Sequence, residues 1–363
     1  MTSFLRRCFS TKLPFPQSEL PPPRLDYRSL SENITAKSLN ALNRKAPIPT
    51  DTLPALARSY AEWKRVSVTL NQLRNKRSLV GDRIKNGFTD DDDGQREKQG
   101  ALDDAAALKS DVKSLETKLS SLDTLLLNLA LPIPNDTHPA SPLGPESAAK
   151  LVYESHAPPH LLPADPNRDH LQIGTHLSLI DLKSGATTTG HAWYFLQNEG
   201  ALLELALMNY ALSVAMNRGY VPVLSPDVVR SDVAHRCGFQ PRDSSDQTAS
   251  HTYHLAPTHP TSPELILAGT AEIPLAGTFA NKVLPSSALP VKLVGMSHSF
   301  RAEAGARSAD SRGLYRVHQF TKVELFVVCQ GEKSQGGIGS DEMMEEMLAL
   351  QKEVLDGLNI PYR

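Results

Sequence analysis

Two stretches of the chain repeat their hydrophobic residues at the spacing of a coiled coil. From Leu56 to Ile84, and again from Ala105 to Leu129, apolar residues recur at alternating steps of three and four positions. This is the pattern of helices that pack against each other along one seam. A polar segment from Gly87 to Gly100 separates the two stretches, and Pro132 and Pro134 follow the second. The pattern predicts an antiparallel helical hairpin, with helices about 45 Å long if roughly thirty residues each rise by about 1.5 Å.

The first of these helices is rich in positive charge. Against Glu62 and Asp82 it holds the basic residues Arg58, Lys64, Arg65, Arg74, Lys76, Arg77, Arg83 and Lys85. One interpretation is that this charged face is simply solvated, as most charged helix faces are. An exposed row of cations also suits the phosphate backbone of RNA, in a contact that is directed by shape and weakened by salt. The charges alone leave both interpretations open, and the acidic tip from Asp90 to Asp93 is expected to lie outside any such contact.

After His170 the chain alternates short apolar runs with helical patterns, which predicts an α+β fold. Helices are expected from Gly200 to about Asn217 and from about Asp341 to Leu358. The expected strands are residues 193–196, 289–296 and 323–328, and a strand–Pro unit is expected over residues 219–227, after the first of these helices.

The last two of these strands enclose a conspicuous pattern of charge. Phe300-Arg301-Ala302-Glu303-Ala304-Gly305 follows the first strand, and Arg316-Val317-His318-Gln319-Phe320-Thr321-Lys322-Val323-Glu324 leads into the second. The glycine, serine and arginine residues between them are typical of a long loop. A planar guanidinium suits a phosphate, and a carboxylate two residues further along a strand points to the same face. The pattern predicts a nucleotide site on an antiparallel hairpin.

A second polar pattern lies upstream, where an apolar run from Leu265 is expected to form a strand that delivers Thr270 and Glu272 to one face. A hydroxyl and a carboxylate two residues apart can receive an ammonium group and a small polar group. A strand that ends in a helix cap would explain Thr270 but not Glu272.

These motifs together are similar to motif 2 and its surroundings in the class II aminoacyl-tRNA synthetases, and they resemble the seryl enzymes most. The resemblance covers most of the chain after about residue 24, and it rests on Arg, Glu, Gly, His, Phe and Glu recurring at fixed offsets. It implies an N-terminal antiparallel α-helical coiled-coil arm followed by a class II antiparallel β-sheet flanked by helices. It also implies an arm that grips tRNA(Ser), and a homodimer built through the helix and strand of residues 200–227, which match motif 1.

The resemblance further implies a role for each matching residue. ATP would contact Arg301, Ala302, Glu303, Val317, His318, Gln319 and Phe320, and serine would contact Thr270, Ala271, Glu272, Arg301 and Glu324. Arg301 and Glu303 are the implied catalytic residues: Arg301 would hold the α-phosphate and the serine carboxylate, and Glu303 the adenine amino group. Phe320 would stack on adenine, and Glu324 would accept a hydrogen bond from the serine hydroxyl. Mg²⁺ would bridge the phosphates of ATP, and Arg312 and Arg316 would lie where the loop can touch phosphates or the tRNA acceptor end.

The third motif of the class is not found: no G-x-x-x-R element follows Arg316. On this ground the sequence is expected to be a C-terminally truncated form, a synthetase-like protein that has lost catalysis, or one part of a protein completed by another piece. The leading hypothesis is a serine-tRNA ligase. The main alternative is a catalytically inactive synthetase-like protein that binds tRNA.

Composition narrows these hypotheses. A chain of 363 residues with 40% hydrophobic residues can form two domains with a core, and a net charge of −2 restricts any nucleic-acid contact to a local surface. Cys8, Cys237 and Cys329 lack metal-ligand spacing and indicate an intracellular protein with reduced thiols. His251, His254 and His259 lie in a loop-like segment without matching acids, so no metal site is predicted. No apolar run approaches the roughly 20 residues of a membrane helix.

The first residues have the composition of a mitochondrial presequence. Arg6, Arg7 and Lys12 occur among serines and threonines, with no acid before Glu19. An ordinary disordered N-terminus is the alternative, in which case the protein would stay in the cytoplasm. The expected organisation is a presequence and proline-rich linker (1–23), a tRNA-binding arm (24–135) and a catalytic domain with motifs 1 and 2 (136–363), working in the mitochondrial matrix.

Overall fold

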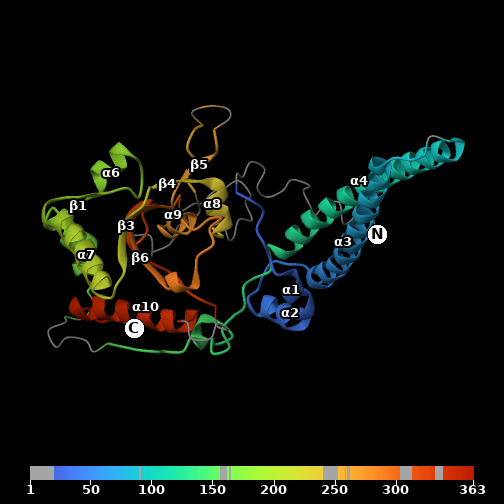
Figure 1. Cartoon of the computed structure of the whole chain (residues 1–363). Coiled ribbons are helices and arrows are strands. Elements are labelled where there is room, and N and C mark those ends of the chain that lie inside the picture. The colour runs from blue at the N-terminus through green and yellow to red at the C-terminus, as the bar shows by residue number, and fades with distance from the viewer. Residues whose placement is uncertain are drawn as a thin grey trace. The chain divides into compact units, whose positions relative to one another are not determined.

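The computed structural model describes residues 20–89, 91–155, 162, 165–239, 252–257, 259, 262–302, 313–331 and 338–363. The described chain forms two compact units, one that contains Pro21–Lys150 and another that contains Leu151–Arg363 (Figure 1).

The first unit is built on a long helical hairpin. Its helices are α1 (Tyr27–Glu32), α2 (Ile34–Asn43), α3 (Thr52–Asn86) and α4 (Asp92–Ala130), with a 3₁₀ turn at Glu146–Ala148. Helices α3 and α4 run side by side in opposite directions (Figure 1). Their predicted seam is confirmed: Leu56, Val66, Leu70, Val112, Leu122, Leu126 and Leu129 are buried.

The tip of the hairpin is shorter than the sequence suggested. The prediction of a polar loop up to Gly100 was wrong, since α4 already begins at Asp92. Asp91 caps this helix by accepting a hydrogen bond of 2.7 Å from the backbone N–H of Gly94. Asp92 and Asp93 then place negative charge in the first turn, where the helix dipole favours it. These effects at the helix start outweigh the low helix propensity of Gly94 and Gly100, which lie in the first turns of α4.

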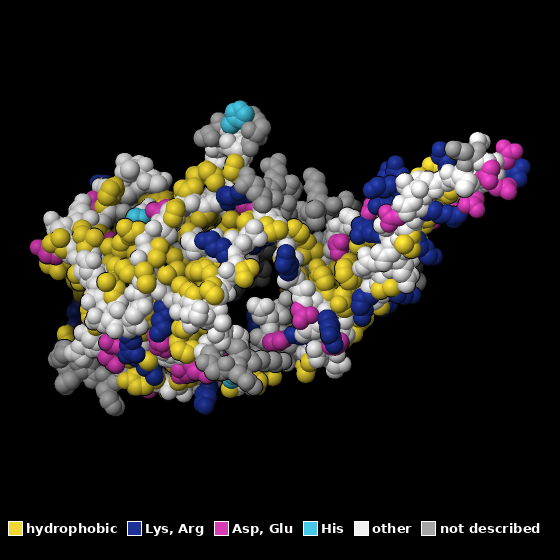
Figure 2. Space-filling view, in the orientation of Figure 1, with side chains coloured by type: hydrophobic (Ala, Val, Ile, Leu, Met, Phe, Trp, Pro, Cys, Tyr) yellow, Lys and Arg dark blue, Asp and Glu magenta, His cyan; other side chains and the backbone are white. Residues whose placement is uncertain are grey.

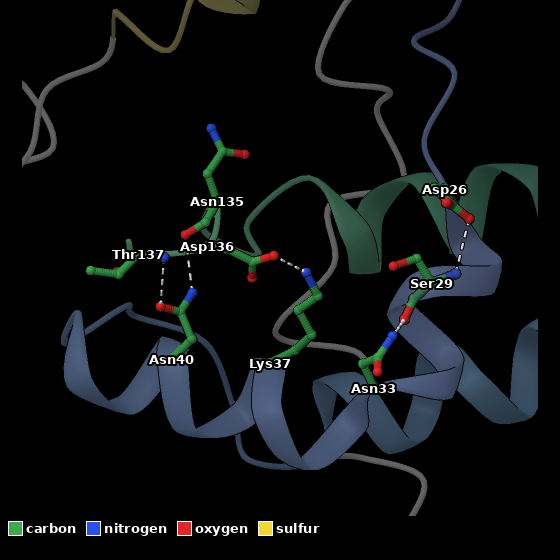
Figure 3. A network of polar contacts seen from close by, with 8 residues as sticks. All are labelled: Asp26, Ser29, Asn33, Lys37, Asn40, Asn135, Asp136 and Thr137. Carbon is green, nitrogen blue, oxygen red and sulfur yellow. Dashed lines mark hydrogen bonds and ion pairs between the residues drawn. The ribbon is translucent and has the colours of Figure 1, made fainter. Parts of the chain in front are cut away.

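Two short helices that the sequence analysis did not predict complete the first unit. Tyr27 and Leu30 of α1 pack against the buried Leu56 and Leu126 at the base of the hairpin. A polar network, which we call the base clamp, joins Lys37 and Asn40 of α2 to residues 135–137 after α4 (Figure 3). The Asn40 side chain donates to the carbonyl of Asn135 at 3.0 Å and accepts from the Thr137 N–H at 3.2 Å, while the Lys37 ammonium lies 2.5 Å from the Asp136 carboxylate.

The second unit contains a three-stranded sheet in the order β3-β6-β7. Strands β6 (Val291–Phe300) and β7 (Gln319–Val328) form the predicted antiparallel hairpin. Strand β3 (Val221–Leu224) joins β6 in parallel, so the sheet is mixed rather than purely antiparallel. The α+β class with an N-terminal helical arm is confirmed.

Helices α7 (Asn198–Asn217) and α10 (Ser340–Gly357) cover one face of this sheet. Val294 of β6 and Leu350 of α10 are buried in this core, and the odd-numbered residues Val323, Leu325 and Val327 of β7 pack against it. Because side chains alternate along a strand, the even-numbered residues of β7 lie on the opposite face.

The remaining elements form smaller sheets and short helices. They are α5 (His170–His176), β1 (Ile180–Asp181), α6 (Leu182–Thr188), β2 (Phe195–Leu196), β4 (Val228–Arg230), α8 (Ser231–Arg236), β5 (Leu265–Leu267) and α9 (Glu272–Gly277), with 3₁₀ turns at Pro166–Arg168 and Ser286–Ala288. Strand β1 pairs with β2 and β4 with β5, both antiparallel. No described helix is both long and apolar enough to cross a membrane.

Candidate amino-acid and nucleotide site

The site is built on the face of the β6–β7 hairpin that lies away from α7 and α10. Phe320, Lys322 and Glu324 share this face of β7, opposite the small residues Ser299, Ser297 and Gly295 of β6. A Cβ atom at Gly295 would lie 2.8 Å from Leu275 Cδ1 and 3.3 Å from Ala271 Cβ. The absence of a side chain at Gly295 therefore lets the segment around Ala271 lie directly against β6, which brings Thr270 to Glu324.

Thr270, Lys322 and Glu324 form one hydrogen-bonded network. The Thr270 hydroxyl donates to Glu324 Oε2 at 2.7 Å, and the Lys322 ammonium donates to Thr270 Oγ1 at 2.8 Å and also pairs with Glu324 Oε2. Thr270 is only 7% exposed, and Ala271 is fully buried. The structure thus brings together two of the predicted serine-binding side chains, Thr270 and Glu324, and adds Lys322, which the sequence analysis did not single out.

Thr270 and Glu272 do not lie on a strand, so that prediction was wrong. Strand β5 ends at Leu267, Thr270 lies in the following turn, and Glu272 is the first residue of α9. The backbone N–H of Glu272 donates to the Thr270 hydroxyl at 3.3 Å, within the turn that precedes α9. Gly269 lies in this turn and Pro274 in the first turn of α9, but the apolar residues around them had suggested one continuous strand. The Glu272 side chain is exposed. Burial of the Cys237 thiol is the main cause that raises its pKa, and the negative charge of Glu272 is the second cause.

Arg301 lies immediately after β6, and contacts of its backbone with His318 fix its position. Its N–H donates to the carbonyl of His318 at 2.9 Å, and its carbonyl lies 3.0 Å from His318 Nδ1. Its guanidinium lies over the Phe320 ring, with 5.2 Å between Cζ and the ring centroid. Its Nε is buried and has no hydrogen-bond partner among the described residues. A buried guanidinium donor without a partner fits an anionic ligand such as a phosphate or a carboxylate.

Aromatic side chains flank His318, whose backbone N–H donates to the carbonyl of Ala192 at 3.2 Å. The Trp193 ring is stacked on His318 with centroids 5.7 Å apart, and the Tyr253 ring meets it edge-on at 6.1 Å. Neither aromatic residue was predicted for the site, because both lie far from His318 in the sequence.

The other predicted nucleotide contacts are placed in part. Val317 is buried, Gln319 pairs with Phe300 where the strand ladder begins, and Ala302 follows Arg301. Arg316 is exposed. Glu303 and Arg312 lie outside the described residues.

Comparison with known protein families assigns both parts of the chain. Residues 25–137 match the seryl-tRNA synthetase N-terminal domain, and residues 253–363 match the tRNA synthetase class II core domain of the glycyl, histidyl, prolyl, seryl and threonyl enzymes. A serine-tRNA ligase from Treponema denticola is 32% identical over 339 residues, which are 93% of this chain and 75% of the relative. The chain belongs to the seryl-tRNA synthetase family.

Further relatives support this assignment. A serine-tRNA ligase from Rubrobacter xylanophilus is 34% identical, with 93% of this chain and 74% of the relative covered. The mitochondrial serine-tRNA ligase of Schizosaccharomyces pombe is 33% identical, with 93% of this chain and 68% of the relative covered. The crystal structure of seryl-tRNA synthetase from Pyrococcus horikoshii, complexed with ATP, superposes with a TM-score of 0.70 at 25% identity and covers 94% of this chain and 76% of that one.

Within the family's N-terminal domain, the predicted arm cations fall into three groups. Arg58, Arg74 and Arg83 form ion pairs with Asp51, Glu116 and Glu97 at 2.8–2.9 Å. Lys64 lies over the Tyr60 ring at 4.8 Å. Arg65, Lys76, Arg77 and Lys85 are exposed and form no ion pair within the described part of the chain. The structure therefore leaves these four cations available to an external anion.

Proposed function

We propose that this protein activates serine with ATP to seryl-adenylate and transfers the seryl group to tRNA(Ser). The observation that supports the proposal best is the closeness of two half-sites on one hairpin. Glu324, hydrogen-bonded by Thr270, offers a carboxylate to a small hydroxylated amino acid, and Arg301, whose Nε is buried and unpaired among the described residues, offers a cation beside the Phe320 ring for a nucleotide. Phe320 and Glu324 lie on the same face of β7, and Arg301 lies directly after β6.

In this proposal the residues act by binding and orientation. The carboxylate of serine is already an anion at neutral pH and attacks the α-phosphorus without a general base, so His318 is not needed to move a proton. Arg301 holds the carboxylate and the α-phosphate in line and offsets charge that develops in the transition state. Phe320 stacks on adenine, with Val317, His318 and Gln319 at its edge, and Glu303 meets the adenine amino group.

Mg²⁺ is expected to accompany ATP rather than to occupy a protein-built cage. Among the described residues, no group of three or more His, Cys, Asp or Glu side chains could hold a metal ion. Mg²⁺ keeps several waters and is commonly bound through substrate phosphates with one or two carboxylates. When bound, it would neutralise phosphate charge.

The decisive experiment is serine-dependent ATP–pyrophosphate exchange on the purified, folded chain, followed by charging of tRNA(Ser). Alanine and threonine serve as matched substrates that lack the hydroxyl or add a methyl group. Exchange with serine alone would support the proposal. A folded protein that binds tRNA(Ser) but shows no exchange would instead be the inactive tRNA-binding protein.

We also propose that the protein is a homodimer that meets its copy through α7 and β3. Leu202, Leu203 and Leu205 of α7 are 65%, 58% and 52% exposed, and Leu224 of β3 is 78% exposed. Hydrophobic side chains gather over α7 and β3 (Figure 2). An apolar surface of this kind on one helix and an adjoining edge strand is typical of an interface. Sedimentation of the wild type and of Leu203→Glu tests this: the variant should be monomeric at concentrations where the wild type is dimeric.

Finally, we propose that the protein works in the mitochondrial matrix. The basic, acid-free composition of the first 18 residues supports this, as does the similarity to the S. pombe mitochondrial enzyme. Import of the chain into isolated mitochondria, compared with a variant that carries Arg6→Glu and Arg7→Glu, tests the proposal. Equal exclusion of both from mitochondria would favour the cytoplasm.

A further inference from the structure

We infer that Lys322 is a positioning residue of the amino-acid pocket: it holds Thr270 and one carboxylate oxygen of Glu324, so that the other oxygen receives the substrate hydroxyl. The inference rests on the proposed function and concerns how the pocket selects a hydroxylated amino acid.

The hydrogen bonds of Thr270 are fully used within the protein. Its hydroxyl has one proton, which goes to Glu324 Oε2, and two lone pairs, which accept from the Lys322 ammonium and from the backbone N–H of Glu272. Thr270 therefore cannot hydrogen-bond a substrate without giving up one of these partners. Its role in this arrangement is to orient Glu324.

The two oxygens of Glu324 are in different situations. Oε2 accepts from Thr270 and pairs with Lys322, whereas Oε1 accepts no hydrogen bond from the described residues. The Glu324 side chain is 23% exposed, so this oxygen has limited access to water. A hydroxyl on a small amino acid satisfies it, while alanine leaves a partly buried acceptor unpaired, which is costly.

Lys322 is suited to this task by its place in the sheet. It lies two residues before Glu324 on the same face of β7, so its side chain can reach both Glu324 and the Thr270 turn. Its positive charge compensates a carboxylate that has lost most of its contact with solvent. Without Lys322, Glu324 would keep only the Thr270 hydroxyl and could turn either oxygen toward the substrate.

The test compares Lys322→Gln and Lys322→Arg with the wild type, and uses Lys292→Gln as a matched control. Lys292 also lies in this sheet and pairs with a carboxylate, Glu346 at 2.7 Å, with similar exposure of 22%, but its partner is on α10, outside the site. The measurements are the KM for serine and for ATP in pyrophosphate exchange, the ratio of serine to alanine activation, and the Kd for serine by calorimetry.

We expect Lys322→Gln to raise the KM and Kd for serine by about tenfold or more, since it loosens a charge-assisted contact, and to reduce discrimination against alanine. The KM for ATP should change less than about twofold, since the nucleotide contacts are intact. Lys322→Arg should recover part of the serine affinity, and Lys292→Gln should lower stability without a selective effect on serine.

Equal rises in both KM values would show a merely structural role and overturn the inference. A lower KM for serine would also overturn it, because the Lys322 ammonium would then be a competitor that occupies the position of the substrate ammonium. If the wild type binds serine but shows no exchange, the proposed function fails, and the serine Kd values alone decide the role of Lys322. If the wild type binds no serine, both proposals fail.

Discussion

The guanidinium of Arg301 covers the ring of Phe320, with 5.2 Å between Cζ and the ring centroid. This stacking links the residue proposed for the phosphate to the residue proposed for adenine. A cation over an aromatic ring stabilises the pair by about 0.5–1 kcal/mol at exposed sites and by more when it is desolvated. Adenine must therefore use the other ring face of Phe320, or Arg301 must leave the ring when the phosphates bind.

Replacing Phe320 with leucine tests the adenine contact. Base stacking on an aromatic side chain contributes about 1–3 kcal/mol, so Phe320→Leu is expected to raise the KM for ATP by about 5-fold to 150-fold and the KM for serine much less. Steady-state pyrophosphate exchange measures both. Phe326→Leu is the matched control, because Phe326 lies on the same strand but stacks on Phe279 at 6.0 Å. An unchanged KM for ATP would remove Phe320 from the site.

Replacing Arg301 tests the charged contact. Arg301→Ala removes the buried donor and should lower the rate of exchange by about 100-fold or more, a loss comparable to that of a preorganised transition-state donor. Arg301→Lys keeps the charge but not the planar fork, so it should be intermediate. Arg218→Lys is the control, because Arg218 pairs with Glu353 of α10 rather than with the site. Activity equal to the wild type in Arg301→Ala would refute the assignment.

Thr270→Val separates the hydroxyl from the shape of the side chain. The variant keeps the Lys322–Glu324 ion pair but removes the hydroxyl to which both side chains are hydrogen-bonded, and we expect a loss of about 1–3 kcal/mol in the free energy of unfolding. The KM for serine should rise as Glu324 loses its orientation. Thr270→Ser keeps the hydroxyl and should behave nearly as the wild type in denaturant melts and in exchange. Equal KM values for serine in the two variants would exclude a role for the hydroxyl.

The sequence could predict the parts of the fold that repeat locally. The seam of α3 and α4 follows from its spacing of three and four residues, and the β6–β7 hairpin follows from two apolar runs around a glycine-containing segment. Helices α1 and α2 were missed, because helices of 6 and 10 residues depend on tertiary packing rather than on their own propensity. The start of α4 was also missed, since it is decided by the cap at Asp91.

The residues of the candidate site could be named from the sequence, but the hydrogen bonds between them could not. The motif residues Arg301, Phe320 and Glu324 could be named, yet the network of Lys322 with Thr270 joins positions 52 residues apart. Only the close approach of the Ala271 segment to Gly295 brings them together. The pattern around Thr270 also misled, because a short apolar run fits both a strand and a turn that opens a helix.

The base clamp should stabilise the first unit. Asn40→Ala removes two hydrogen bonds to residues 135–137 and is expected to lower the free energy of unfolding by about 1–2 kcal/mol, as measured in urea. Lys37→Gln should cost less than about 1 kcal/mol, since its partner Asp136 is exposed. Asn43→Ala is the control, because Asn43 is exposed on the same helix. No difference between Asn40→Ala and Asn43→Ala would mean that the clamp contributes nothing to stability.

The ion pairs of the arm predict which of its cations bind tRNA. Arg65, Lys76, Arg77 and Lys85 form no ion pair in the described structure, whereas Arg58, Arg74 and Arg83 would have to leave an acidic partner before they meet a phosphate. Changing Lys76 and Lys85 to Gln should therefore weaken tRNA(Ser) binding and flatten its dependence on salt by somewhat less than one unit of slope per lost phosphate contact.

The paired change Arg58→Gln and Arg83→Gln removes the same amount of charge and is the matched comparison. It should have the smaller effect on binding, because each arginine is already neutralised by its neighbour within 2.9 Å. Filter binding at several salt concentrations measures both variants, and pyrophosphate exchange without tRNA should stay at the wild-type rate in each. If both variants lost affinity equally, the contact would depend on total arm charge rather than on the unpaired cations. If neither variant lost affinity, the charged face of α3 would simply be solvated, and residues elsewhere in the protein would have to bind the tRNA.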